Sequence, residues 1–159
     1  MGADTAKIAT ATRIVRRAAG ASARQVSADI CVLGAGIAGV SAALEAARLG
    51  RNVALVDALP ALGGQSVNSI IGTFCGLFAN GTHGYQLTHG IADDILRELG
   101  AQGALHYRRG GPSNTTVVMY DEVALSRWVE EAVRKAEVTV LLGAILRAVT
   151  RDEIGRAHV

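Results

Sequence analysis

The pattern of apolar and polar positions predicts a strand–helix–strand unit early in the chain. A short apolar run, Ile30–Leu33, leads into a glycine-rich stretch. Apolar residues then recur at the spacing of one helix face, at Val40, Ala43, Leu44 and Ala47. Gly50 predicts the end of this helix. A second apolar run, residues 53–56, ends on Asp57. The order indicates a βαβ unit, and therefore an α/β fold with a parallel sheet.

Helical spacing returns between residues 85 and 99, where every fourth residue is apolar: Leu87, Ile91, Ile95 and Leu99. This predicts an amphipathic helix that contains Gly90 and is closed by Gly100. The polar residues 102–114 that follow predict a loop. Its arginine pair, Arg108 and Arg109, could contact an acidic substrate, although such a pair is usually solvent-exposed.

The remaining residues predict two further strands and one more helix. Residues 115–120 form an apolar strand pattern, and Asp121 is a good N-cap for a helix that runs to about Ala136. Its expected buried face is Leu125, Val129 and Val133. Residues 138–142 predict a buried strand. Gly143 then predicts a turn into another strand at residues 144–149.

The glycines between the first strand and the first helix have the spacing of a dinucleotide-binding fingerprint, GxGxxG. Gly34 allows a sharp turn, Gly36 lets the backbone approach a pyrophosphate, and Gly39 lets the helix pack close to the strand. The helix N-terminus then faces the phosphates. Asp57 is placed to accept hydrogen bonds from a ribose, and its charge makes NADP the least expected dinucleotide. The spacing alone is weak evidence, because an ordinary βαβ unit can also contain a glycine turn.

A second glycine motif follows Asp57, in the segment Leu62-Gly63-Gly64-Gln65-Ser66. With this motif the chain resembles the amino-terminal part of the FAD-dependent oxidoreductases of the two-dinucleotide-binding-domain superfamily. It is most similar to the group of fumarate reductase and succinate dehydrogenase flavoproteins. Covalently flavinylated relatives carry a histidine soon after the doublet, where this chain has Gln65 and Ser66, so histidyl attachment is not expected.

The resemblance implies FAD as the cofactor and a Rossmann-type FAD-binding fold. The doublet is implied to run past the pyrophosphate and the ribityl chain. Together with the fingerprint, the expected cofactor-binding residues are Gly34, Ala35, Gly36, Ile37, Ala38, Gly39, Asp57, Ala58, Gly63, Gly64, Gln65 and Ser66.

The resemblance covers residues 28–149, so we expect an incomplete FAD-binding domain at residues 28–150. Residues 153–159 match no family pattern, and residues 151–159 are expected to be a non-native tail. Residues 1–27 predict a basic flexible tail, with a targeting segment or a frayed helix as alternatives. Arg16 and Arg17 could begin a twin-arginine signal, but no apolar segment follows them, and we therefore expect a cytoplasmic protein.

Composition narrows the function classes further. Half of the 159 residues are apolar, which suits one close-packed domain, and no apolar run is long enough to predict a membrane span. The formal net charge of +2 arises from residues 1–27, so no basic patch in the rest of the chain predicts a nucleic-acid partner.

The two cysteines, Cys31 and Cys75, lack metal-type spacing, and no metal site is predicted. Cys31 is expected in a buried strand. Cys75 is expected to be a small buried residue more readily than a thiol near the flavin. His83 and His89 are candidate proton donors, although surface histidines are commoner.

The sequence thus favours an FAD-dependent oxidoreductase that acts on a small-molecule substrate together with an electron acceptor. No residue identifies itself as the catalytic acid or base. A non-catalytic dinucleotide-binding fragment is one alternative. An NAD-binding dehydrogenase domain is another, and it is disfavoured by the glycine doublet and by the long segment between Asp57 and the next predicted parallel strand.

Overall fold

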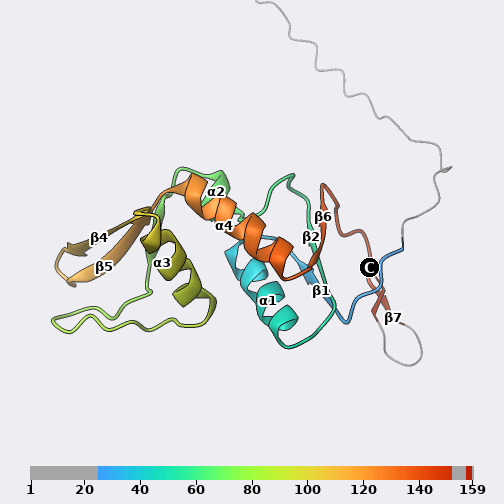
Figure 1. Cartoon of the computed structure of the whole chain (residues 1–159), viewed down its shortest axis with the longest axis horizontal. Coiled ribbons are helices and arrows are strands. Elements are labelled where there is room, and N and C mark those ends of the chain that lie inside the picture. Colours follow the sequence, from blue (N-terminus) through green and yellow to red (C-terminus); the bar gives the residue numbers. More distant parts are fainter. Residues whose placement is uncertain (1–24, 152–156, 159) are drawn as a thin grey trace, which may run out of the picture.

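A computed structural model describes residues 25–151 and 157–158 (Figure 1). The expectations for the basic tail fall almost entirely outside the described residues, as do those for most of the C-terminal tail. Within the described residues, no helix combines the length and the apolar character needed to cross a bilayer.

A three-stranded parallel sheet forms one end of the molecule. Its strands are β1 (Ile30–Leu33), β2 (Val53–Asp57) and β6 (Thr139–Leu142), in the order β1-β2-β6. Helix α1 (Ile37–Arg48) connects β1 to β2 and packs on one face of the sheet (Figure 1). The predicted βαβ unit and the α/β fold with a parallel sheet are confirmed.

The buried face of helix α1 agrees with the face that its periodicity predicts, except at one position. Val40, Ala43 and Leu44 are buried, and Ala46 is buried where Ala47 was expected, with Ala47 half-buried. The helix ends at Arg48, and Gly50 follows with a φ of +75°. The predicted glycine stop is therefore confirmed.

The expectation that Cys31 lies in a buried strand is wrong: β1 is an edge strand of the sheet, and Cys31 is exposed on it. Side chains alternate along a strand, so Cys31 and Leu33 point away from the face on which Val32 packs against the core. Leu33 is 46% exposed. An apolar run therefore identified the strand correctly but did not show that only one of its faces is covered.

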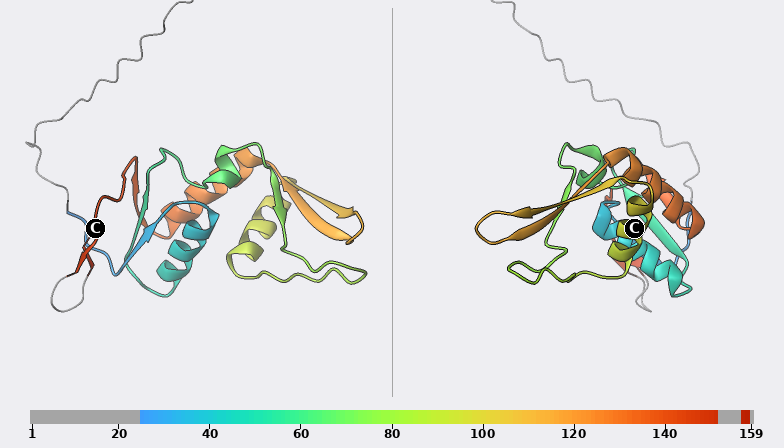
Figure 2. Two further views of the ribbon diagram at one scale, coloured as in Figure 1. Left: turned by 180° about the vertical axis from the view of Figure 1, so that it is seen from behind. Right: turned by 60° about the vertical axis from the view of Figure 1, so that its left-hand side comes forward.

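An antiparallel sheet forms the other end of the molecule. It consists of β3 (Thr73–Cys75), β4 (Leu105–Gly110) and β5 (Thr115–Tyr120), in the order β3-β5-β4. The β4–β5 hairpin projects from the body of the molecule (Figure 2). Cys75 at the end of β3 is exposed, so its predicted burial is also wrong.

The predicted loop at residues 102–114 is also wrong, because half of it is strand β4. Its residues pair in register with β5, from Leu105 opposite Tyr120 to Gly110 opposite Thr115. The polar side chains of β4 are mostly exposed and give no apolar alternation. Pairing with the apolar β5 imposes the strand where local sequence does not predict one.

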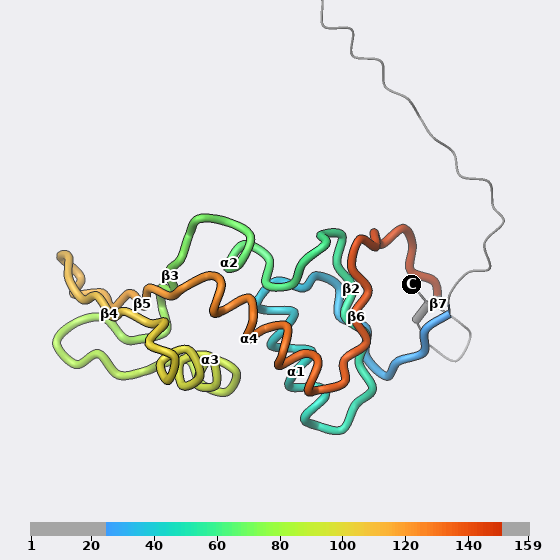
Figure 3. Tube along the Cα trace, turned by 45° about the horizontal axis from the view of Figure 1, so that its top comes forward, coloured from blue at the N-terminus to red at the C-terminus, as the bar shows by residue number. Residues whose placement is uncertain are grey.

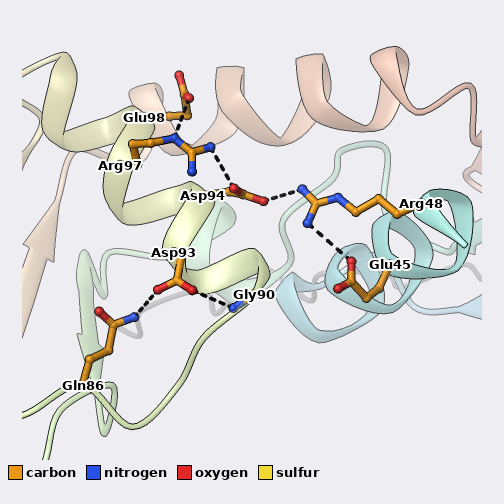
Figure 4. Close-up of polar contacts among 8 residues, drawn as sticks. All are labelled: Glu45, Arg48, Gln86, Gly90, Asp93, Asp94, Arg97 and Glu98. Carbon is orange, nitrogen blue, oxygen red and sulfur yellow. Dashed lines mark hydrogen bonds and ion pairs between the residues drawn. The ribbon is translucent and has the colours of Figure 1, made fainter.

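Helix α3 (Ile91–Ala101) begins and ends later than its periodicity predicts. Gly90 is the N-cap with a φ of +76°, outside the helical region. The backbone N–H of Gly90 donates to Asp93 Oδ2 at 2.9 Å, and Gln86 Nε2 donates to Asp93 Oδ1 at 2.6 Å (Figure 4). Residues 85–89 are therefore non-helical. Gly100 lies inside the helix, and the chain turns at Gly103, which has a φ of +68°.

Helix α4 (Glu122–Lys135) joins the two ends of the molecule. It runs alongside α3 and α1 before the chain enters β6 (Figure 3). The Asp121 side chain accepts a hydrogen bond from the N–H of Ala124 at 2.8 Å, which confirms the predicted N-cap. The predicted face is also confirmed, since each of its members is at most 2% exposed: Leu125, Val129 and Val133.

An ion-pair cluster connects α1 to α3. Asp94 on α3 accepts hydrogen bonds from Arg48 on α1 and from Arg97 one turn along α3 (Figure 4). The Asp94 side chain is only 17% exposed, and the Arg48 guanidinium holds its pKa below the ordinary value. This carboxylate therefore stays ionised at neutral pH between the two helices.

The strand predicted at residues 144–149 is absent. Gly143 turns with a φ of +67°, and the N–H of Ala144 donates to the backbone carbonyl of Asp57 at 3.0 Å. Ile145 is 80% exposed. Residues 145–149 pair with no described strand, and a short pair follows, β7 (Thr150–Arg151) with β8 (Ala157–His158).

Candidate dinucleotide-binding site

The turn between β1 and α1 is fixed by hydrogen bonds that its N–H groups donate to the end of β2. The N–H of Gly34 donates to the carbonyl of Val56 at 2.7 Å. Gly34 has a φ of +100°, a conformation that residues with a side chain rarely adopt. Ala35 follows with no exposed surface, and its N–H donates to Asp57 Oδ2 at 2.5 Å. The first glycine therefore makes the sharp turn that the fingerprint predicts.

Gly39 allows the first turn of α1 to lie directly against β1. A Cβ atom at this position would stand 1.8 Å from the carbonyl oxygen of Gly34 and 3.4 Å from Val32 Cγ1. No side chain fits at such a distance from backbone. The third glycine thus has the packing role predicted for it.

Gly36 occupies the N-cap of α1 and faces open space. A Cβ atom built on Gly36 would meet no atom within 4 Å. No side chain caps the helix, and its first turn contains no acidic residue. The first N–H groups of a helix have no intrahelical partner, and they carry the positive end of the helix dipole. The beginning of α1, formed by Gly36, Ile37 and Ala38, can therefore receive an anion.

Asp57 lies at the carboxyl end of β2, beside this turn. Its Oδ1 accepts a hydrogen bond from the N–H of Leu59 at 2.7 Å, while Oδ2 accepts the one from Ala35. The backbone N–H groups of Leu59, Ala35 and Ala58 hold the pKa of the Asp57 carboxyl below its ordinary value. An ionised carboxylate has about four lone-pair positions, so two hydrogen bonds leave it able to accept more.

The glycine doublet packs on the fingerprint turn. Gly63 pairs with Gly36 as an isolated parallel bridge, and its N–H donates to the carbonyl of Ala35 at 2.8 Å. Gly63 and Gly64 have φ values of +93° and +54°. A Cβ atom on Gly64 would lie 2.8 Å from Gly36 Cα. Two motifs separated by more than twenty residues thus form one glycine-lined surface.

The doublet leads into a short helical turn, α2 (Gln65–Asn68). Gln65 is exposed and Ser66 is half-buried. The hydroxyl of Tyr120 on β5 donates to the backbone carbonyl of Ser66 at 2.9 Å, and its ring stacks on Phe74 with centroids 4.2 Å apart. The sequence pattern does not predict that Tyr120 supports this segment. Its position at the end of an apolar strand gave no such signal.

The other candidate groups lie outside this turn. His83 and His89 are exposed, and His89 Nδ1 lies 3.2 Å from Asp93 Oδ1. Arg109 donates to the backbone carbonyl of Gly81, and Arg108 is exposed on β4. Among the described residues, no group of three or more His, Cys, Asp or Glu residues is arranged to hold a metal ion.

Comparison with solved structures identifies the fold. The chain is 20% identical to THI4 from Thermovibrio ammonificans, with a TM-score of 0.52 over 79% of this chain and 42% of that one. It is also 20% identical to the 3-ketosteroid-Δ4-(5α)-dehydrogenase of Rhodococcus jostii RHA1, with a TM-score of 0.54 over 81% of this chain and 40% of that one. A flavocytochrome c3 fumarate reductase is also 20% identical, with a TM-score of 0.50 over 79% of this chain and 28% of that one.

These similarities extend over less than half the length of each of those proteins. No curated protein sequence matches the chain. The model of one protein family, described as FAD dependent oxidoreductase, matches residues 29–159, and the cofactor of that family is FAD. The match includes both glycine motifs and Asp57, and the chain therefore belongs to the family of FAD-dependent oxidoreductases.

Proposed function

We propose that the protein binds FAD along its two glycine motifs and uses it to oxidise or reduce a small-molecule substrate. The observation that carries this proposal is the open space at Gly36, at an uncapped helix N-terminus beside an ionised carboxylate. A side chain at Gly36 would occupy that space. The residues present therefore fit a dinucleotide whose pyrophosphate is bound by backbone N–H groups.

In this proposal the beginning of α1 binds the pyrophosphate. Gly36, Ile37, Ala38 and Gly39 supply backbone N–H groups and the positive end of the helix dipole. Gly34 and Ala35 shape the turn that presents them. The geometry that supports this role is the missing Cβ at Gly36 together with the missing cap.

Asp57, with Ala58 next to it, is proposed to bind the adenosine ribose. The carboxylate keeps lone-pair capacity for further hydrogen bonds, which suits a ribose hydroxyl donor. A 2′-phosphate would meet its negative charge. FAD and NAD share an unphosphorylated ribose, and the NADP class is disfavoured.

The doublet is proposed to guide the rest of the cofactor past the turn. The lack of a side chain at Gly64 lets the doublet pack directly on Gly36, so a ligand in the open space at Gly36 would lie beside the doublet as well. Gln65 and Ser66 extend the glycine-lined surface toward the antiparallel sheet. At Ser66 this surface is supported by Tyr120, which stacks on Phe74 and donates a hydrogen bond to the Ser66 carbonyl.

When bound, FAD supplies hydride or single-electron transfer at its flavin ring. The part of the chain described by the structure contributes binding and orientation, and we assign no residue of it as an acid or base. The proposal requires a small-molecule substrate and an electron acceptor as partners.

Titration of the purified chain with FAD, FMN, NAD and NADP tests the proposal. Binding of FAD, measured by quenching of flavin fluorescence, should be tighter than binding of FMN, because FMN has neither the pyrophosphate nor the adenosine ribose. NAD and NADP carry no flavin, so their binding is measured by titration calorimetry, and NADP should be the weakest dinucleotide. If a folded chain shows no preference for FAD over FMN, the proposed function is wrong.

A further inference from the structure

A cavity of about 410 Å³ lies between the first two turns of α1 and the beginning of α3. Its volume is in the range of small-molecule binding sites, which are mostly apolar with a few polar groups. Apolar side chains from three elements and one loop form most of its wall: Ile37, Ala42, Phe74, Leu77, Ile91 and Ile95. The cavity is not part of the glycine-lined surface, although Ile37 borders both.

The polar groups at the cavity favour an uncharged ligand. Its charged residue Glu45 already pairs with Arg48 at 3.4 Å, and His89 pairs with Asp93. The remaining polar side chains are the hydroxyl groups of Ser41 and Thr88. A hydroxyl can donate and accept hydrogen bonds without demanding a charge from its partner.

Two residues of the cavity wall, Ile37 and Phe74, are neighbours of residues proposed to bind or support the cofactor. Ile37 directly follows Gly36, the residue proposed to meet the pyrophosphate. Phe74 forms part of the cavity wall and stacks on Tyr120, which holds the Ser66 carbonyl. A molecule in the cavity would therefore contact Ile37 and Phe74, each next to a residue that is proposed to contact or support the cofactor.

We propose that this cavity binds the uncharged, mainly apolar part of the substrate, with a hydroxyl or carbonyl group of the ligand hydrogen-bonded to Ser41. This inference rests on the proposed FAD-dependent function. It extends that function by giving the substrate class as a neutral apolar small molecule rather than an organic acid.

The test uses 2-naphthol as the probe and the full chain with its isoleucine methyl groups labelled with ¹³C. With FAD present, the probe should produce saturable shifts at the methyl groups of Ile37, Ile91 and Ile95. Ala42→Phe places a ring in the cavity and should weaken probe binding at least tenfold. Ala101→Phe, at an exposed helix position outside the cavity, is the matched control and should bind as the unaltered chain does.

Other results would contradict either the substrate site or the proposed function, and the two cases can be distinguished. If FAD binds but the probe does not, or if Ala42→Phe binds it normally, the substrate site is wrong and the proposed function stands. If FAD and the probe compete, the cavity belongs to the flavin itself, and a separate substrate site is excluded. If the methyl shifts follow protein concentration without any probe, a second copy of the chain occupies the cavity. If FAD fails to bind at all, the proposed function is wrong, and the inference falls with it.

Discussion

A Cβ atom at Gly39 would lie 1.8 Å from the carbonyl oxygen of Gly34, so the third fingerprint glycine and the first are in direct backbone contact. A Cβ atom at Gly36, by contrast, would meet no atom within 4 Å. The three glycines therefore have different roles: one turns the chain, one leaves space open, and one lets the helix pack on the strand. Substitutions at these positions should affect stability and binding separately.

Gly39→Ala should destabilise the fold. Overpacking usually costs about 1–3 kcal/mol, and contact with rigid backbone places this substitution at or above about 3 kcal/mol. The free energy of unfolding is measured by urea denaturation. Gly36→Ala is the matched control, because its φ of −67° suits alanine and its Cβ meets open space. Equal stability of the two variants would contradict the close approach at Gly39.

Gly36→Val should leave the fold intact but weaken FAD binding at least tenfold. The branched side chain would occupy the space in which the backbone is proposed to meet the pyrophosphate. Circular dichroism checks the fold, and flavin fluorescence gives the affinity. A folded Gly36→Val variant with unchanged affinity would mean that the pyrophosphate lies elsewhere.

Asp57→Ala should weaken FAD binding by about 1.5–3 kcal/mol, the usual scale for a hydrogen bond to a charged group. The same carboxylate also holds the N–H of Ala35, so the substitution disturbs the turn as well. A ligand lacking the ribose 2′-hydroxyl separates the two effects. The 2′-deoxyadenosine analogue of FAD should bind the unaltered chain more weakly than FAD does, and Asp57→Ala should remove most of that difference. If the analogue loses as much affinity in Asp57→Ala as in the unaltered chain, Asp57 is not the ribose ligand.

The sequence predicted the parts of the fold that depend on local pattern. The βαβ unit, the Gly50 stop and the Asp121 cap each depend on residues close together in the chain, and the structure has all three. The position of Asp57 beside the fingerprint turn also followed from the spacing, because parallel strands end at the same edge of the sheet.

The parts that sequence missed depend on distant partners. Strand β4 exists because β5 pairs with it, and residues 144–149 form no strand because no described strand pairs with them. The contact of Gly64 with Gly36 joins two motifs that could be recognised singly but not placed against each other. The apolar residue at every fourth position also predicted too early a start for α3. The helix begins only after Gly90, whose φ is incompatible with a helix.

The exposure of both cysteines predicts that both thiols react with a disulfide reagent such as DTNB in the native state. Thiol release should reach two equivalents per chain without denaturant. The variants Cys31→Ser and Cys75→Ser should each release one equivalent. A thiol that reacts only after denaturation would show that its side chain is covered, as the sequence had suggested.

The ion pair between Arg48 and Asp94 should stabilise the packing of α1 on α3 to a small but measurable extent. Arg48 is half exposed while Asp94 is mostly covered. The coupling energy of the pair should therefore be about 0.5–1 kcal/mol, near the top of the range for surface pairs. A double-mutant cycle with Arg48→Met and Asp94→Asn measures it. The pair of Arg134 and Glu131, which lies within one helix, is the control, and its coupling should be weaker.

The pH dependence of this coupling follows from the carboxyl group. Arg48 lowers the pKa of Asp94 in the folded state below the ordinary value of 3.8. The folded state therefore binds that proton less readily than the unfolded state, and the stabilisation is fully present well above pH 3.8. It should decrease as the pH falls through the folded-state pKa, and it should also decrease at high salt. A coupling energy that is the same at pH 7 and at pH 2.5, in a chain still folded at both, would show that the two helices do not interact through this charge pair.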